Sequence, residues 1–187
     1  SDVQKKLRGK KGTKVDVSIK RSNNTELLNF TITRDKIPIY SVDASYMATS
    51  DIGYIKVNRF AQKTIDEFKA GLSKLKQQNM KHLIIDLRGN GGGYLKTAIQ
   101  MVDEVLDNKR LVVYTEGSKA PKQEYYTTDK GGFEQGKLVV LIDEGSASAS
   151  EIVSGAIQDY DRGLIIGRRS FGKGLVQKPF SLPDGSA

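Results

Sequence analysis

The chain of 187 residues contains no cysteine and a single histidine, His82. The lack of cysteine excludes disulfides, thiol catalysis and cysteine-based metal sites. Because His82 has no second histidine with which to form a metal site, we expect it to be structural or exposed and the chain to need no metal. No apolar run approaches the ~20 residues of a membrane-spanning helix. No stretch resembles a signal peptide either, although the chain begins at Ser1 rather than at an initiator methionine.

Positive charge is in excess, but it is concentrated near one end of the chain. The net charge is +8, and residues 1–40 contain ten lysines and arginines against four acidic residues. This segment lacks aromatic residues interleaved with the basic ones, on which nucleic-acid bases could stack. We therefore interpret it as a solvated β surface and expect no nucleic-acid partner.

Residues 1–34 have the pattern of a β-hairpin. Apolar residues alternate with polar ones on both sides of a turn-forming stretch at 22–25, namely Val15, Val17, Ile19, Leu28, Phe30 and Ile32. This alternation predicts two half-buried antiparallel strands. The linker-like stretch 34–38 ends the pattern, so we assign residues 1–34 to one module and residues 35–187 to a second.

The second module alternates between strand-like and helix-like segments. Continuous apolar runs predict strands at 51–57, 83–87, 111–114, 138–143 and 163–167. Apolar stripes of helical spacing lie at 65–75, 95–106 and 152–160, and Thr64 with Glu67 predicts a capping box for the first helix. This order predicts an α/β fold with a largely parallel sheet. The polar stretch 115–136 is interpreted as a surface excursion or, alternatively, as a flap that contacts substrate.

Three serines follow the fourth predicted strand and precede a helical pattern. Ser146, Ser148 and Ser150 therefore lie where a helix begins and its backbone N–H groups are unpaired. Further along, Lys173 and Gln177 would project from the same face of an extended segment. A serine at a helix start with a nearby lysine suggests Ser/Lys peptidase chemistry, in which lysine replaces histidine as the general base.

Such chemistry needs a neutral lysine. Because the reference pKa of lysine is about 10.4, the amine must be buried among apolar neighbours, and Phe171, Leu175 and Val176 could form this wall. Gln177 would orient the amine. For an arbitrary serine-rich turn, the better explanation would be that the serines cap a helix and that Lys173 is solvated.

Nucleotide binding is a rival explanation of the glycine-rich segments. Residues 167–173 fit the first seven positions of a Walker loop, but Gly174 replaces the hydroxyl residue that would hold Mg²⁺. Gly89 and Gly91 fail the dinucleotide pattern, because Tyr94 replaces its third glycine. We therefore expect no nucleotide and no other cofactor.

Three motifs resemble those of the C-terminal processing peptidases, also called tail-specific proteases. The motifs are Ser-Ala-Ser-Ala-Ser-Glu-Ile at 146–152, Phe-Gly-Lys-Gly-Leu-Val-Gln at 171–177 and Asp-Leu-Arg-Gly-Asn-Gly-Gly-Gly at 86–93. The resemblance implies that Ser148 is the nucleophile, and that Lys173 is the base.

The same resemblance assigns supporting roles around this dyad. It implies that Gln177 orients the lysine, and that the backbone N–H groups of Ala149 and Gly92 form the oxyanion hole. It further implies a catalytic core like that of the crotonase and Clp peptidase superfamily. Residues 1–34 would then be a partial PDZ-like module, and residues 35–187 a catalytic core truncated at its C-terminal end.

The function implied by the resemblance is a serine endopeptidase that cleaves proteins in their C-terminal regions. Its partners would be protein or peptide substrates, and its location the periplasm or cell envelope. The alternative is a peptide-binding scaffold that has kept the fold and lost turnover. All three candidate catalytic side chains, Ser148, Lys173 and Gln177, are present, which favours the enzyme.

Overall fold

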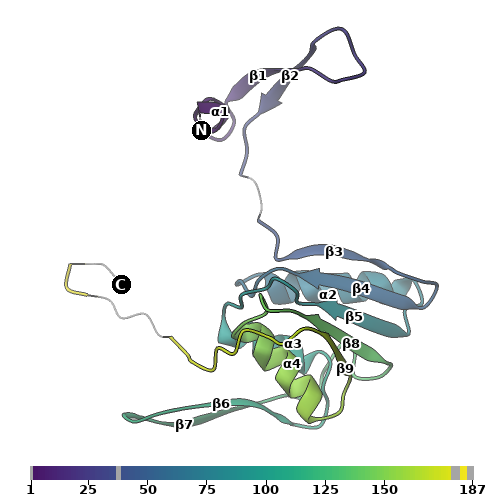
Figure 1. Ribbon diagram of the computed structural model, residues 1–187, viewed down its shortest axis with the longest axis vertical. Helices are drawn as coiled ribbons and strands as arrows, with labels where there is room; N and C mark the ends of the chain where they lie inside the picture. Colours follow the sequence, from purple (N-terminus) through teal and green to yellow (C-terminus); the bar gives the residue numbers. More distant parts are fainter. Residues whose placement is uncertain (1, 37–38, 178–181, 185–187) are drawn as a thin grey trace. The chain divides into compact units, whose positions relative to one another are not determined.

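The structure is a computed structural model that describes residues 2–36, 39–177 and 182–184 (Figure 1). The chain forms two compact units, residues 1–39 and residues 40–187. The division falls a few residues after the boundary expected from the sequence. None of the described helices is long and apolar enough to cross a membrane.

The first unit contains a short helix and a hairpin: α1 (Asp2–Leu7), β1 (Lys14–Ile19) and β2 (Leu28–Thr33). The two strands pair antiparallel with Val17 opposite Phe30, which confirms the predicted hairpin. The prediction of half-buried strands holds only in part, because Ile19, Phe30 and Ile32 are 41%, 44% and 49% exposed. Outside the hairpin, the Arg34 guanidinium donates hydrogen bonds to three backbone carbonyls and thereby joins α1 to β1.

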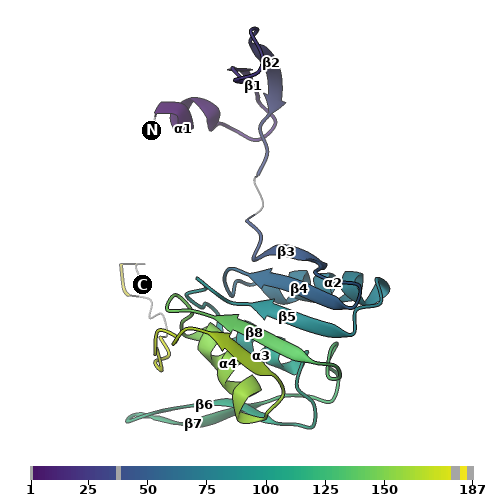
Figure 2. The same ribbon diagram turned by 45° about the vertical axis from the view of Figure 1, so that its right-hand side comes forward.

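The second unit is built on a five-stranded mixed sheet with the order β3-β4-β5-β8-β9 (Figure 2). Its strands are β3 (Val42–Met47), β4 (Ile52–Val57), β5 (His82–Asp86), β8 (Leu138–Ile142) and β9 (Leu164–Gly167). Strands β4, β5, β8 and β9 pair in parallel, and β3 pairs antiparallel with β4. The predicted α/β fold with a largely parallel sheet is therefore confirmed, while β3 was not predicted.

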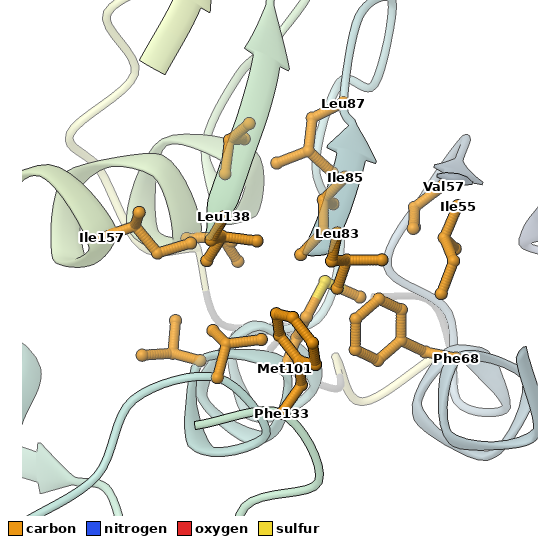
Figure 3. Packing of buried hydrophobic residues seen from close by; sticks show 14 of the residues in the cluster. Ile55, Val57, Phe68, Leu83, Ile85, Leu87, Met101, Phe133, Leu138 and Ile157 are labelled. Atoms are coloured by element: carbon orange, nitrogen blue, oxygen red, sulfur yellow. The ribbon is translucent and has the colours of Figure 1, made fainter. Parts of the chain in front are cut away.

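Three helices pack against the buried face of this sheet. They are α2 (Thr64–Gln77), α3 (Leu95–Asp103) and α4 (Ala149–Asp159). Strand residues two apart, such as Ile55 and Val57 or Leu83 and Ile85, point toward the helices and are fully buried (Figure 3). They meet apolar side chains of the helices, among them Phe68, Met101 and Ile157. This packing fixes the carboxyl ends of β5 and β8, which carry the residues described below.

The apolar run at 111–114 forms a strand, but this strand does not join the main sheet. Strand β6 (Leu111–Gly117) pairs antiparallel with β7 (Ala120–Tyr126) in a separate hairpin (Figure 1). The stretch 115–136 is therefore partly a strand and not only a polar excursion. A central strand of a parallel sheet is buried on both faces. Strand β6 does not have this pattern, because Val112 is its one buried residue and Tyr114 is 54% exposed.

The predicted capping box at the start of α2 is wrong. The N-cap residue is Lys63, without a side-chain capping bond. The Thr64 hydroxyl instead accepts a hydrogen bond from the Ala61 N–H at 2.8 Å. The Glu67 carboxylate accepts bonds from the N–H groups of Ser41 and Val42 at 2.7 and 3.0 Å. Glu67 therefore anchors the entry to β3, a long-range role that competes with local capping.

Candidate active site

Residues 145–150, called the serine turn below, lead from β8 into α4 and carry Ser148 in an unusual backbone conformation. Its φ and ψ are 56° and −110°, so it is a non-glycine residue with positive φ at the N-cap of α4. A residue held in such a sparsely populated region stores strain, which persists only when its surroundings over-determine it. The prediction that the serines lie at a helix start is confirmed, because α4 begins at Ala149.

The two neighbouring serines have structural hydrogen bonds. The Ser146 hydroxyl donates to the Leu87 carbonyl at 2.8 Å and accepts from the Asp143 N–H at 3.0 Å. The Ser150 hydroxyl donates to the Asn90 carbonyl at 2.8 Å. Both serines are fully buried. They join the serine turn to the loop after β5, and of the three serines only Ser148 lines the cavity described below.

Asn90 organises the glycine loop, residues 88–93, which follows β5. Its side chain is fully buried, and its Nδ2 donates to the Val57 carbonyl at 2.9 Å. Its Oδ1 accepts from the Gly92 N–H at 2.9 Å, and its backbone carbonyl accepts from the Ala147 N–H at 3.0 Å. One residue thus connects β4, the glycine loop and the serine turn.

Gly92 lets the glycine loop approach the serine turn closely. Its φ is +97°, and a Cβ on this residue would lie 2.6 Å from the Ala147 carbonyl oxygen and 2.9 Å from the Ser148 Cβ. Both distances are too short for a real side chain. A residue other than glycine here would therefore push the two segments apart.

The backbone N–H groups near Ser148 differ in their hydrogen bonding. Among the residues that the structure describes, the Ala149 N–H has no partner, as expected for the first residue of a helix. The Gly92 N–H is already bonded to Asn90. The neighbouring Gly93 N–H makes no hydrogen bond within the described ranges. The structure therefore offers Ala149 and Gly93 as unoccupied donors, and the sequence-based choice of Gly92 stays a prediction.

Lys173 lies in an extended segment that is not a strand, because the last described strand, β9, ends at Gly167. Its Nζ donates to the Gln177 Oε1 at 3.1 Å, so the two side chains meet as expected. The expected apolar wall is absent: Phe171, Leu175 and Val176 are 69%, 75% and 50% exposed. That part of the prediction is wrong for the described chain, because this segment has no layer packed over it here.

Glu151, on the first turn of α4, bonds to both candidate catalytic segments. Its Oε2 accepts from the N–H groups of Ser148 and Lys173 at 2.7 and 2.8 Å. Its Oε1 accepts from the Ser170 hydroxyl and the Gly172 N–H at 2.8 and 2.6 Å. Burial raises the pKa of Glu151, but these four hydrogen bonds outweigh it and hold the pKa below its ordinary value.

A buried carboxylate anchors the start of the glycine loop. Asp86, at 1% exposure, accepts hydrogen bonds from the Arg88 guanidinium at 2.7 Å and the Tyr54 hydroxyl at 2.6 Å. Lys56 lies 3.3 Å away. Burial raises the pKa of Asp86, but these donors lower it by more, so the pKa lies below its ordinary value. Burial and the bond to Asp86 raise the pKa of Tyr54 to about 12.

A cavity of about 1190 Å³ brings the predicted site residues together. Its lining includes all five of them: Gly92, Ser148, Ala149, Lys173 and Gln177. Val113 and Tyr114 of β6 also line it, which supports the flap interpretation of the β6–β7 hairpin. In the described part of the chain, no hydrogen bond joins the Ser148 Oγ to the Lys173 Nζ.

Two residues of the site escaped the sequence analysis as functional candidates. Glu151 follows Ser148 by three positions, which is capping-box spacing, and this signal could have identified it. Asn90 gives no such local signal, because its partners lie on β4 and in the serine turn.

His82 is structural, since its Nδ1 accepts from the Lys137 N–H at 3.2 Å. The described residues contain no cluster of side chains that could hold a metal.

Residues 51–187 match the model of peptidase family S41. The chain belongs to this family. Among curated S41 relatives, it is 38% identical over 186 residues to the "Probable CtpA-like serine protease" of Staphylococcus epidermidis, covering 98% of this chain and 37% of that protein. It is 34% identical to the carboxy-terminal processing protease CtpB of Bacillus subtilis, covering 97% of this chain and 38% of CtpB.

The fold of this S41 chain also resembles a solved structure. The photosystem II D1 C-terminal processing protease aligns with a TM-score of 0.70 and 29% identity, covering 98% of this chain and 51% of that one. The resemblance to processing peptidases inferred from the motifs is thereby confirmed. The chain spans less than two fifths of the length of the two curated relatives.

Proposed function

We propose that this chain carries the catalytic dyad of a serine endopeptidase that cleaves proteins in their C-terminal regions. The observation that carries the proposal is the placement of Ser148. It lies on a strained turn at a helix start, in one cavity with Lys173 and beside the N–H of Ala149, which has no partner among the described residues. These are the parts that nucleophilic acyl transfer requires.

In the proposed reaction, the Ser148 Oγ attacks the carbonyl carbon of the scissile peptide bond while the neutral Lys173 amine takes its proton. The resulting oxyanion receives hydrogen bonds from the Ala149 N–H and from the glycine loop. Collapse of this intermediate breaks the C–N bond, and Lys173 returns the proton to the leaving amine. Water then hydrolyses the acyl-enzyme, with Lys173 again acting as base.

The oxyanion hole is proposed to consist of Ala149 and one N–H of the glycine loop. Gly92 can serve if its bond to Asn90 is exchanged for one to the oxyanion. Gly93 can serve without such an exchange, because its N–H is unpaired among the described residues. Gln177 holds the Lys173 amine through the bond at 3.1 Å and limits its rotation.

The family resemblance supports the remaining parts of the proposal. The second unit would be a core of the crotonase and Clp peptidase type, and residues 1–34 would belong to a PDZ-like module. Protein or peptide chains would be the substrates, and no cofactor would be needed. The enzyme would act in the periplasm or cell envelope.

One observation favours the competing function, a peptide-binding scaffold without turnover. Ser148 and Lys173 share the cavity but are not hydrogen-bonded to each other in the described residues. A base must come within about 3 Å of the hydroxyl it deprotonates, although such bonds often tighten only in the substrate complex.

Labelling by a serine-directed fluorophosphonate decides between the two functions. The full-length protein and its Ser148→Ala, Ser146→Ala and Ser150→Ala variants are treated with the probe and assayed for peptide hydrolysis. We expect Ser148→Ala to abolish labelling and to lower turnover by at least about 10³-fold. The other two variants should keep more of both activities. Labelling that persists in Ser148→Ala would refute the assignment, and a wild-type protein that binds peptides without labelling would support the scaffold.

A further inference from the structure

We propose that Glu151 is a positioning residue that sets Lys173 relative to Ser148. The inference rests on the proposed function of these two residues, and it assigns to one carboxylate the alignment of the dyad. A single oxygen, Oε2, accepts the backbone N–H of the nucleophile residue and the backbone N–H of the base residue. The two catalytic segments therefore share one acceptor atom.

The other oxygen of Glu151 holds the same segment from the other side. Oε1 accepts from the Ser170 hydroxyl and from the Gly172 N–H. Three of the four donors thus belong to residues 170–173, which form no strand with the sheet. Residues 171–173 have one other hydrogen bond from the backbone in the described chain, between the Phe171 N–H and the Ser146 carbonyl at 3.0 Å.

Glu151 acts at a distance from the substrate. It does not line the cavity, whereas Ser148 and Ala149 on one side of it and Ile152 on the other do. A change at Glu151 should therefore alter the alignment of the catalytic groups more than the binding of peptide. This separation distinguishes a positioning residue from one that contacts substrate.

The carboxylate is required because all four of its partners act as donors. A glutamine side chain has one acceptor oxygen and one NH₂ group, which donates hydrogen bonds. With the NH₂ group at the Oε2 position, it faces the N–H groups of Ser148 and Lys173. With the NH₂ group at the Oε1 position, it faces the Gly172 N–H. In either orientation at least one backbone donor loses its acceptor.

The chain offers a matched control in Glu144. This glutamate lies just before the serine turn and pairs with Arg168 at 3.3 Å, but its side chain is 69% exposed and bonds to neither catalytic residue. Glu144→Gln makes the same chemical change in the same region. It should leave kcat and KM within about twofold of the wild type, because exposed ion pairs contribute little.

The test measures kcat and KM for a peptide substrate together with amide hydrogen exchange of the segment 170–177, in the full-length protein. In Glu151→Gln we expect kcat to fall by about 10²-fold with KM changed less than threefold, since small misplacements of catalytic groups have effects of this size. Exchange in 170–173 should become faster while α4 keeps its protection. Ser170→Ala removes one donor of the four and should have a smaller effect, which Ser170→Thr should restore.

The outcomes separate the positioning role from the proposed function. A Glu151→Gln variant with wild-type kcat and unchanged exchange in 170–173 would overturn the positioning role. A fall in kcat accompanied by a loss of exchange protection throughout α4 would also overturn it, because this result would indicate general unfolding. If Glu151→Gln speeds exchange in 170–173 but fluorophosphonate does not label the wild type, Glu151 still positions the segment and the peptidase function is refuted. The fluorophosphonate result for the wild type is read first for this reason.

Discussion

The two segments that meet at the candidate active site are held in opposite ways. The serine turn and the glycine loop are joined by buried side chains, and Ser146, Ser150 and Asn90 are each at 0% exposure. The segment around Lys173 instead has exposed apolar neighbours and no strand pairing in the described chain. The nucleophile is therefore fixed by buried contacts, whereas the base is fixed by a few hydrogen bonds, chiefly those of its segment to Glu151 and of its amine to Gln177.

This difference shows where the site is preorganised and where it can change. The conformation of Ser148 depends on β8 and α4, which pack into one hydrophobic core (Figure 3). It also depends on the glycine loop, whose Asn90 carbonyl accepts hydrogen bonds from the Ala147 N–H and the Ser150 hydroxyl. The position of Lys173 depends on Glu151 and Gln177. Substitutions on the first side should act through the fold, and those on the second through the alignment of the base.

The largest effect is expected for Lys173→Arg, which tests the base side of the comparison. Arginine keeps the positive charge but cannot lose its proton in a protein, so it cannot accept one from Ser148. We expect turnover to fall by at least about 10³-fold, a loss typical of removing a member of a catalytic unit. Initial rates of peptide hydrolysis by the full-length protein measure it.

Gln177→Ala is the graded control for this prediction. It removes the amide that holds the Lys173 amine and leaves the amine itself in place. The rate should fall by about tenfold, which is less than for the arginine variant, because an orienting group assists a base that is still present. Substantial turnover by Lys173→Arg would show that Lys173 acts only through its charge.

Gly92→Ala tests the fixed side of the comparison and should have the second largest effect. The new Cβ would collide with the Ala147 carbonyl oxygen and with Ser148, so the loop must move away from the nucleophile. We expect kcat to fall by about 10²-fold, because the N–H donors of the loop move with it. Steady-state kinetics should show a smaller change in KM.

Gly89→Ala is the matched control, because both glycines have positive φ. At Gly89, where φ is +71°, a Cβ would have no atom within 4 Å. The variant should therefore lose stability through backbone strain of about 1 kcal/mol and keep kcat within a few-fold. Equal losses of kcat in the two variants would indicate general disruption of the loop.

The parts of the site predicted well from the sequence are those encoded by adjacent elements. The predicted strand 138–143 followed by helical spacing located the serine turn, because a helix that begins soon after a strand has unpaired N–H groups at its start. The four-residue spacing of Lys173 and Gln177 correctly predicted their contact, although the segment is not a strand.

The parts that were not predicted depend on distant residues or on irregular strands. The alternation in β3 is weak, and a register shift between Val42 and Ala44 breaks its period. The run 111–114 indicated a strand but not which strand it pairs with, since apolar runs carry no information about partners. Glu67 was assigned to a local cap because its two partners, Ser41 and Val42, lie on another element.

The smallest effect on turnover is expected for Asp86→Asn, which lowers the stability of the fixed side and does not alter the lining of the cavity. The pKa of Asp86 is lowered in the folded state, so its stabilisation is complete above the unfolded pKa of about 4 and is lost as the pH falls toward the folded value. At pH 7 the variant should lose about 2 kcal/mol, the range for hydrogen bonds to a charged group. Urea unfolding between pH 7 and pH 2 measures the difference.

The shape of this pH dependence distinguishes Asp86 from an ordinary surface carboxylate. The stability gap between the wild type and Asp86→Asn should stay constant from pH 7 to about pH 5 and should narrow below pH 4, where the unfolded wild type takes up a proton. Asp129→Asn is the control, because Asp129 is exposed and lies 3.8 Å from Lys109, and it should show no measurable gap at any pH. A gap for Asp86→Asn that stayed constant down to pH 2 would mean that size or packing, and not the charge of Asp86, anchors the glycine loop against the sheet.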